Sequence, residues 1–272
     1  MSIVLDKNWE RALKVLAKMT TGKGFKTLYL WGVAGTGKTW AAYQTAHKYY
    51  AITLTPETPM AELRGFHMPV GKEFKWVDGP VISAMREGAR VVLNEISHAG
   101  PDVMSFLHPV LEGKGTCRIT LPTGETVKSE EGFHVVATDN YPLEDLPGPL
   151  QDRFNAQICI DTYSPGGLAG LGERIRAWAS KAEVAMRDGR GISLRNWYAL
   201  ESSLEQGFGL EESCLLVFGE DKGGNIYTGL RASDILKEEK TGVKQEDPKE
   251  TQEGLAGSVG EESEEVLIVE ED

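Results

Sequence analysis

The chain has 272 residues, 40% of them hydrophobic and 26% charged, which is the composition of a globular protein with one large domain or two modest ones. Of the net charge of −12, the 13 acidic and 4 basic residues of 237–272 contribute −9 and the rest of the chain only −3, which argues against nonspecific nucleic-acid binding by the whole surface. Three widely spaced cysteines, with no bilayer-length apolar stretch and no signal-peptide core, exclude a membrane-spanning or disulfide-built protein and predict a cytoplasmic one.

Strand and helix signals alternate along the first 160 residues. The expected elements up to the middle of this region are a helix at 3–20, a strand at 26–31, a glycine-rich turn with a helix to about 49, a strand at 51–55, a short helix at 58–65 and a hairpin at 66–80. The remaining ones are a helix at 81–89, a strand at 90–94, a helix at 101–113, a hairpin at 117–128, and strands at 133–138 and 156–160. This alternation predicts a three-layer α/β domain with a parallel sheet.

Composition also suggests where the chain divides. The breaker cluster "YSPGG" at 163–167 marks a boundary, after which helices predominate, interrupted by the loop "GEDKGGN" at 219–225. The final segment is rich in Glu, Lys, Gly and Gln and lacks aromatic residues, which is typical of disorder. We therefore predict four parts: an N-terminal helix at 1–24, an α/β nucleotide-binding core at 25–163, a small helical lid at 164–236 and an acidic disordered tail at 237–272.

Residues 32–39, "GVAGTGKT", fit the eight-residue phosphate-loop pattern and lie between a predicted strand and a predicted helix. Glycines let the backbone curl so that its N–H groups point inward, and the next helix adds the positive end of its dipole. We expect the Lys38 ammonium to neutralise the outer phosphates and the Thr39 hydroxyl to bind magnesium. The alternative is a glycine-rich turn with a surface lysine. The predicted nucleotide-binding residues are Gly32, Gly35, Thr36, Gly37, Lys38, Thr39 and Trp40.

A second strand, "RVVLNE", ends on an amide and a carboxylate. In phosphate-loop enzymes such a strand, which we expect beside the first, delivers groups to the magnesium ion and the attacking water. Glu95 would then polarise that water, unless it is a surface glutamate at a strand end. Asn94 stands where an acid would hold the magnesium shell. Two unit charges about 4 Å apart interact by roughly 4 kcal/mol at a dielectric of about 20, so the uncharged amide predicts weaker magnesium affinity and slow turnover.

These motifs, in this order, resemble an AAA+ ATPase of the MoxR-like, helix-2-insert branch over about residues 25–200. "WVDGPVISAMREGARVVLNEISHAG" resembles the stretch from the insert hairpin through the Walker B strand, and "FHVVATDNY" resembles the sensor 1 strand. "LPGPLQDRF" resembles the segment with the arginine finger, and "ISLRNW" resembles the sensor 2 region. The resemblance implies that Asn140 holds the attacking water with Glu95, that Arg153 reaches a neighbour's phosphate, and that Arg195 touches the γ-phosphate. A turn asparagine, a surface arginine and a structural arginine are the plainer alternatives.

The resemblance further implies ATP and Mg²⁺ as cofactors and a homo-oligomeric ring, a hexamer, because a finger acts on an adjacent subunit's site. Family members act as chaperones that remodel or mature a partner protein, frequently one with a von Willebrand factor A domain. The insert near Val70–Trp76 and the hairpin at 117–128 would contact this client. A nucleic-acid motor is the alternative. In that case Lys72 and Lys75 would neutralise a nucleic-acid strand, and Phe74 and Trp76 would stack on its bases. A third reading is a scaffold that binds ATP and hardly hydrolyses it.

Overall fold

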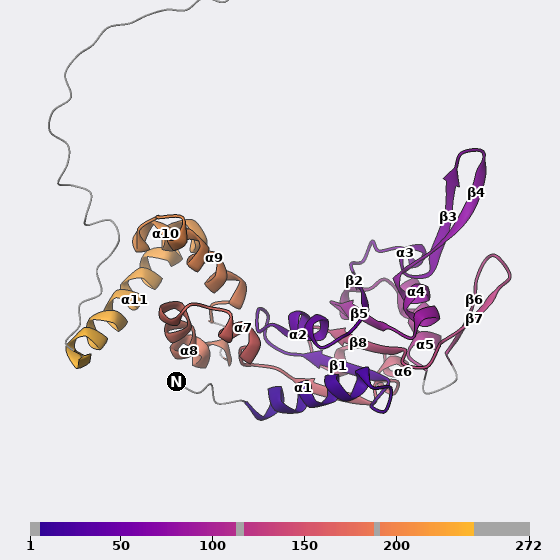
Figure 1. The fold of residues 1–272 in the computed structure, drawn as a ribbon, viewed down its shortest axis with the longest axis horizontal. Coiled ribbons are helices and arrows are strands. Elements are labelled where there is room, and N and C mark those ends of the chain that lie inside the picture. Colours follow the sequence, from indigo (N-terminus) through magenta and orange to yellow (C-terminus); the bar gives the residue numbers. More distant parts are fainter. Residues whose placement is uncertain (1–5, 113–116, 188–190, 242–272) are drawn as a thin grey trace, which may run out of the picture. The chain divides into compact units, whose positions relative to one another are not determined.

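The computed structural model describes residues 6–112, 117–187 and 191–241. The chain divides into two compact units, one ending at Tyr198 and the other beginning at Ala199. The first unit contains an α/β sheet domain and the second is helical (Figure 1). The boundary expected near residue 163 falls inside the first unit.

A parallel sheet of five strands forms the centre of the first unit. In spatial order the strands are β2 (Tyr49–Thr53), β5 (Arg90–Asn94), β8 (His134–Thr138), β1 (Thr27–Trp31) and β9 (Ala156–Cys159). Strand β8 thus separates β1 from β5, and the expectation that "RVVLNE" adjoins the first strand is wrong. Hydrophobic runs identify buried strands, but the order of strands depends on how the crossover helices pack.

Helices cover both faces of this sheet. One face carries α1 (Lys7–Thr20) and α2 (Lys38–Gln44), and the other carries α3 (Met60–Arg64), α4 (Pro80–Glu87), α5 (Pro101–Val110) and α6 (Gly148–Gln151). Adjacent residues of a strand serve opposite layers, because side chains alternate along a strand. In β1, Leu28 and Leu30 join the core under α1, whereas Tyr29 joins the core under α4 and α5. The predicted three-layer α/β architecture is confirmed.

The helix after the phosphate-loop motif is shorter than predicted. It ends at Gln44, and the hydroxyl of Thr45 donates a hydrogen bond of 2.8 Å to the carbonyl of Ala41 in the last turn. Tyr49 instead begins β2, where it pairs with Arg90 and its ring stacks on Tyr43 at 4.6 Å between centroids. Pairing with β5 therefore places Tyr49 in a strand, although the sequence pattern had assigned it to the helix.

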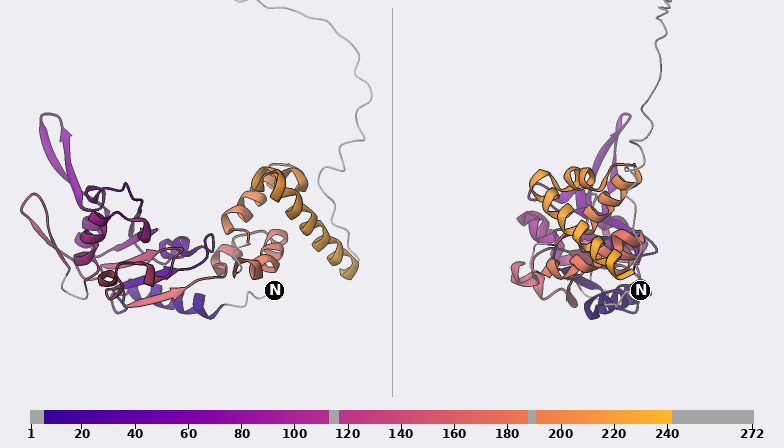
Figure 2. Two further views of the ribbon diagram at one scale, coloured as in Figure 1. Left: turned by 180° about the vertical axis from the view of Figure 1, so that it is seen from behind. Right: turned by 90° about the vertical axis from the view of Figure 1, so that its left-hand side faces the viewer.

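Both predicted hairpins are present and project from the same end of the first unit (Figures 1 and 2). One consists of β3 (Gly65–Val70) and β4 (Glu73–Asp78), and the other of β6 (Arg118–Thr120) and β7 (Thr126–Lys128). Arg86 of α4 joins them. Its guanidinium donates to Asp78 at 2.7 Å and, through both terminal nitrogens, to Glu125 at 2.6 and 2.7 Å.

The remaining elements are 3-10 turns of three residues each and the later helices. They are η1 (Ile96–His98), η2 (Leu143–Asp145), α7 (Pro165–Ala169), α8 (Glu173–Arg187), α9 (Leu194–Glu205), α10 (Leu210–Phe218) and α11 (Glu220–Thr241). The loop predicted at 219–225 is wrong, since Gly219, at φ 78°, alone separates α10 from α11. Of the predicted tail, residues 237–241 belong to α11, and 242–272 lie outside the described residues. No helix in the described part of the chain combines the length and apolarity needed to cross a bilayer.

Candidate nucleotide-binding site

The parallel sheet brings three chain segments together at its carboxyl edge. The phosphate-loop motif follows β1, Glu95 follows β5, and Asn140 lies two residues beyond β8. Because the three strands run in the same direction, the turns after them meet at one edge of the sheet, which is where α/β proteins bind their ligands. Most of the residues predicted for nucleotide binding and hydrolysis therefore share one site.

Lys38 is buried in this site, with 6% of its surface exposed. Its ammonium donates to the carbonyls of Gly32 and Val33, both at 2.8 Å, and lies 3.4 Å from Oδ1 of Asn140. Burial lowers the pKa of Lys38 to about 8, an effect that the charge of Asp139 opposes. A buried cation held by neutral groups inside a glycine turn can take an anion as its partner.

The Thr39 hydroxyl and Asn94 form the second contact of the site. Thr39 Oγ1 donates to Asn94 Oδ1 at 3.1 Å, and Thr138 Oγ1 donates to the same oxygen at 3.0 Å. The Asn94 amide donates to the Tyr43 hydroxyl at 2.9 Å, so the side chain is oriented from both ends. Hydroxyl and amide oxygens are ligands that Mg²⁺ accepts, directly or through its water shell, and the pair fits such an ion without contributing charge. Among the described residues, no cluster of three or more acidic, histidine or cysteine side chains could hold a metal.

Glu95 adopts a left-handed backbone conformation, with φ 56°. Among the described residues it is the only non-glycine residue with a positive φ. Its amide donates to the carbonyl of Thr138 at 2.8 Å. Its side chain is 49% exposed, and Oε2 lies 3.4 Å from Nδ1 of His98. A strained turn at a strand end is a common feature of functional sites, and here it presents the carboxylate to solvent at the sheet edge.

Asp139, which the sequence analysis did not single out, is buried between these turns, 3% exposed. Its oxygens accept from the amide and hydroxyl of Ser97 at 2.7 and 3.0 Å, and from the amides of Asn140 and Tyr141 at 2.7 and 3.2 Å. The sequence signal for this residue was an acid directly before Asn140, the predicted sensor. The sequence could not show that Ser97 is its partner, because Ser97 is 42 residues away in the chain.

Backbone amides at the starts of two later helices, α7 and α9, donate hydrogen bonds to the phosphate-loop motif. The amide of Ser164, the N-cap of α7, donates to the carbonyl of Thr36 at 2.7 Å, and the amide of Leu194 donates to the carbonyl of Gly35 at 2.9 Å. Gly35 has φ 76°, and a Cβ there would overlap the side chain of Ser193. Arg195 follows this contact, with its side chain exposed. Trp40, 45% exposed, places its ring against Gly166 of α7.

Arg153 lies at the other edge of the sheet. Its carbonyl accepts from the hydroxyl of Thr27, the first residue of β1, at 2.7 Å, whereas the phosphate-loop motif follows the last residue, Trp31. Four residue steps along the strand separate these ends by roughly 13 Å. The guanidinium is held by its own chain: Nε donates to the carbonyl of His108 at 3.2 Å, Nη2 to Glu112 Oε1 at 3.0 Å, and Nη1 to the carbonyl of Pro149. Arg153 is thus not part of its own chain's site.

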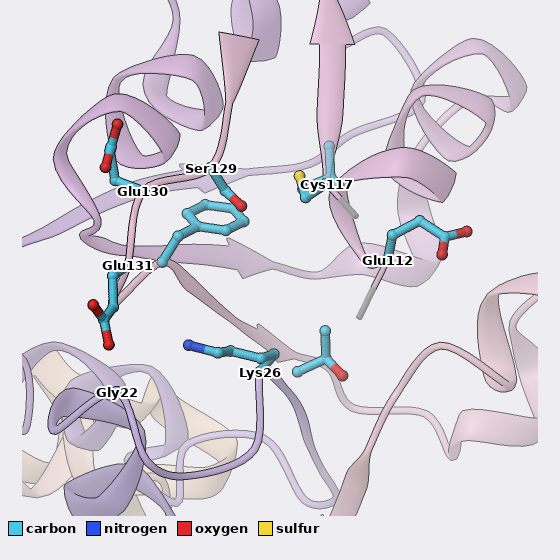
Figure 3. A pocket seen from close by; sticks show the side chains of 10 residues that line it. Gly22, Lys26, Glu112, Cys117, Ser129, Glu130 and Glu131 are labelled. Carbon is cyan, nitrogen blue, oxygen red and sulfur yellow. The ribbon is translucent and has the colours of Figure 1, made fainter. Parts of the chain in front are cut away.

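A pocket of about 260 Å³ opens near the same edge. Its lining includes Lys26, Thr27, Cys117, Ser129 and Phe133, as well as Glu112, whose carboxylate points away from Lys26 and Cys117 (Figure 3). Burial raises the pKa of the Cys117 thiol to about 12, so this sulfur stays protonated at neutral pH. None of the residues predicted for nucleotide binding lines this pocket, whereas most of them lie at the carboxyl edge of the sheet.

The parallel sheet, the glycine turn around Lys38 and the Thr39–Asn94 pair define a phosphate-loop NTPase domain. Residues 27–154 match the family described as "AAA domain (dynein-related subfamily)", and the domain that they form belongs to this family. The resemblance expected from the motifs is confirmed at this level.

Two relatives each match a part of the chain. Protein NorQ of Paracoccus denitrificans is 35% identical over 113 residues, which are 40% of this chain and 42% of NorQ. The denitrification regulatory protein NirQ of Stutzerimonas stutzeri is 29% identical over 147 residues, 53% of this chain and 48% of NirQ. The matches thus span less than half of these relatives. Among solved structures, NtrX of Brucella abortus in complex with ATP aligns at a TM-score of 0.44 and 14% identity, over 87% of this chain and 53% of NtrX.

Proposed function

We propose that this chain binds ATP with Mg²⁺ and hydrolyses it. The observation that carries this proposal is the buried Lys38 ammonium, held by loop carbonyls and adjoining Asn140 at the edge where Thr39 meets Asn94. The γ-phosphoryl group of ATP would be transferred to the attacking water, with cleavage of the bond to the β-phosphate and release of ADP and inorganic phosphate. Lys38 neutralises the charge of this group, Glu95 accepts the proton of the water, and Asn140 orients that water. Arg195 follows the residue that contacts Gly35 and senses the γ-phosphate from the same chain.

Arg153 supports assembly into a ring, for which we propose a hexamer. Because its guanidinium lies at the sheet edge away from its own phosphate-loop motif, any ATP phosphate that it contacts belongs to a neighbouring subunit. Head-to-tail contacts of this kind close into rings. The arginine then couples hydrolysis in one subunit to the position of the next.

The β3–β4 hairpin supports a protein client, as for a MoxR-like chaperone that remodels a partner, including one with a von Willebrand factor A domain. The register pairs Phe66 with Val77 and Met68 with Lys75, so Phe66, Met68, Val70 and Val77 share one face of the hairpin. These four side chains are 39–48% exposed. Exposed apolar side chains in a row are typical of protein-binding surfaces.

A nucleic-acid motor is the second candidate. Phe74, 73% exposed, and the exposed Lys72 and Lys75 lie near the hairpin tip. There the Phe74 ring can stack on a base of single-stranded nucleic acid, and the lysines can neutralise its phosphates. Trp76, which we expected to take part, is engaged: its indole donates to Asp78 at 2.6 Å and its ring packs edge-on against His67. Stimulation of ATP hydrolysis by single-stranded DNA, with steep salt dependence, would favour this candidate.

The test compares three variants of the full chain by ATP-binding calorimetry and by multiple-turnover phosphate release. We expect Lys38→Met to abolish binding, Glu95→Gln to bind ATP but lose turnover, and Lys14→Met, an exposed control on α1, to resemble the wild type. Wild-type protein that takes up no ATP at millimolar concentration with Mg²⁺ present would refute the proposal. Binding without repeated turnover would support the ATP-gated scaffold instead.

A further inference from the structure

We propose, on the premise of the ATPase function above, that Asp139 is a positioning residue that holds the turns of Glu95 and Asn140 together and supplies the buried negative charge that Asn94 lacks. Asp139 follows β8, the strand between β1 and β5. Its own amide donates to the carbonyl of Leu30 in β1 at 2.9 Å, which extends the strand ladder to this residue. The carboxylate therefore lies between the phosphate-loop motif and the turn that carries Glu95.

The first part of the proposal concerns geometry. Both bonds from Ser97 reach Asp139, and Ser97 belongs to the 3-10 turn that begins directly after Glu95. Because Glu95 has φ 56°, its turn needs support from outside, and Asp139 provides two hydrogen bonds of 2.7 and 3.0 Å. On the other side, the bond from the Asn140 amide fixes the residue whose side-chain oxygen is 3.4 Å from the Lys38 ammonium. One carboxylate thus sets the spacing of both groups.

The second part concerns charge. Asn94 is neutral, and the Glu95 carboxylate is half exposed, so solvent screens its charge. Among the described residues of the first unit, Asp139 is the acid that is buried, and its charge favours the protonated form of Lys38. All four of its hydrogen-bond partners are donors, which is the arrangement that a carboxylate satisfies best. The negative charge of this site therefore comes from the end of β8 rather than from the end of β5.

The charge is tested by moving it. Asp139→Asn keeps the shape and removes the charge, and we expect kcat for ATP hydrolysis to fall at least tenfold while KM changes less than threefold. Adding Asn94→Asp to this variant restores a carboxylate at the neighbouring strand end, and it should raise kcat at least fivefold more than the same substitution does in the wild-type chain. The matched control is Asp102→Asn, an exposed acid of α5. A kcat for Asp139→Asn within twofold of wild type, or a gain from Asn94→Asp no larger than in the wild-type chain, would overturn the charge assignment.

The geometry is tested without nucleotide, by amide hydrogen exchange. In Asp139→Asn one acceptor oxygen becomes an NH₂ donor, so the amide of Ser97 loses its partner, or those of Asn140 and Tyr141 do if the side chain turns round. We expect the affected amide to exchange at least tenfold faster, with β1 unchanged. Wild-type rates at all three amides would overturn the positioning role. Because this measurement needs no ATP, it decides the role of Asp139 even if the proposed ATPase function fails.

Discussion

The hydroxyl of Thr39 and the side-chain oxygen of Asn94 meet at 3.1 Å, which joins the phosphate-loop motif to the end of β5. Asn94 is oriented from its other end by Tyr43, whose hydroxyl can also donate, so an aspartate fits the same space. This contact is the place where a carboxylate would act on a magnesium ion.

Asn94→Asp should tighten magnesium binding and speed hydrolysis. A charge acting through a water shell is worth less than the roughly 4 kcal/mol of a direct pair, and we expect about a tenfold lower half-saturating magnesium concentration. The measurement is a magnesium titration of phosphate release at saturating ATP. Asn225→Asp, which adds the same charge on α11, is the control. An unchanged magnesium requirement would contradict the idea that the amide weakens the site.

Arg153→Ala should strongly lower ATP hydrolysis in a homogeneous preparation, and mixing with Lys38→Met subunits should restore part of it. Subunits with Arg153→Ala keep an intact nucleotide site, whereas subunits with Lys38→Met keep the arginine. Mixing the two inactive proteins should therefore restore a part of the activity, since the arginine lies at the sheet edge remote from its own Lys38. Loss of the finger alone should reduce kcat by about 10³-fold. If mixing restores nothing, the arginine does not act between subunits.

Gly35→Ala should destabilise the chain more than Gly71→Ala. Both glycines have positive φ, 76° and 66°, so each alanine carries a similar backbone strain of about 1–2 kcal/mol. At Gly71 no atom lies within 4 Å of the added methyl group, whereas at Gly35 the methyl would overlap Ser193. Overpacking adds about 1–3 kcal/mol, which should appear as a lower urea midpoint for Gly35→Ala. Equal midpoints would show that Ser193 does not press on the loop.

His134 should make the protein less stable in mild acid. It is buried beside Arg90, whose Nε donates to His134 Nε2 at 2.9 Å, while Nδ1 lies 2.6 Å from the carbonyl of Gly132. Burial, reinforced by the charges of Arg90 and Lys26, lowers the pKa of His134 from 6.5 to about 4, although the bond to Gly132 opposes the shift. The unfolded chain therefore binds more protons between pH 6.5 and 4, and the free energy of unfolding should fall by about 3 kcal/mol as pH falls through that window.

Urea unfolding from pH 7.5 to 4 measures this effect. His134→Gln, whose oxygen can accept from Arg90, should flatten the pH dependence, whereas the exposed His47→Gln should leave it intact. Parallel curves for wild type and His134→Gln would show that the acid sensitivity arises elsewhere.

Much of the site was predictable because it is local. The phosphate-loop motif consists of eight consecutive residues, and the Lys38 ammonium bonds to carbonyls of the same loop, five and six residues earlier in the chain. The two hairpins followed from alternation around Gly71 and around 122–124. The break expected at 219–225 failed because Gly223 packs against the carbonyl of Cys214, where a side chain would not fit, so its helix continues. A glycine chosen for close packing looks, in sequence, like a glycine chosen for a turn.

The sequence by itself determined the α/β class, the phosphate-loop motif and the identity of the strand-end residues Asn94, Glu95 and Asn140. Only the tertiary structure decided that β8 separates β1 from β5, that Asp139 joins Ser97, and that Arg153 lies at the far edge of the sheet. The physical reason is that hydrophobic periodicity records which faces of an element are buried, whereas strand order and side-chain partnership depend on crossovers and packing between segments distant in the chain.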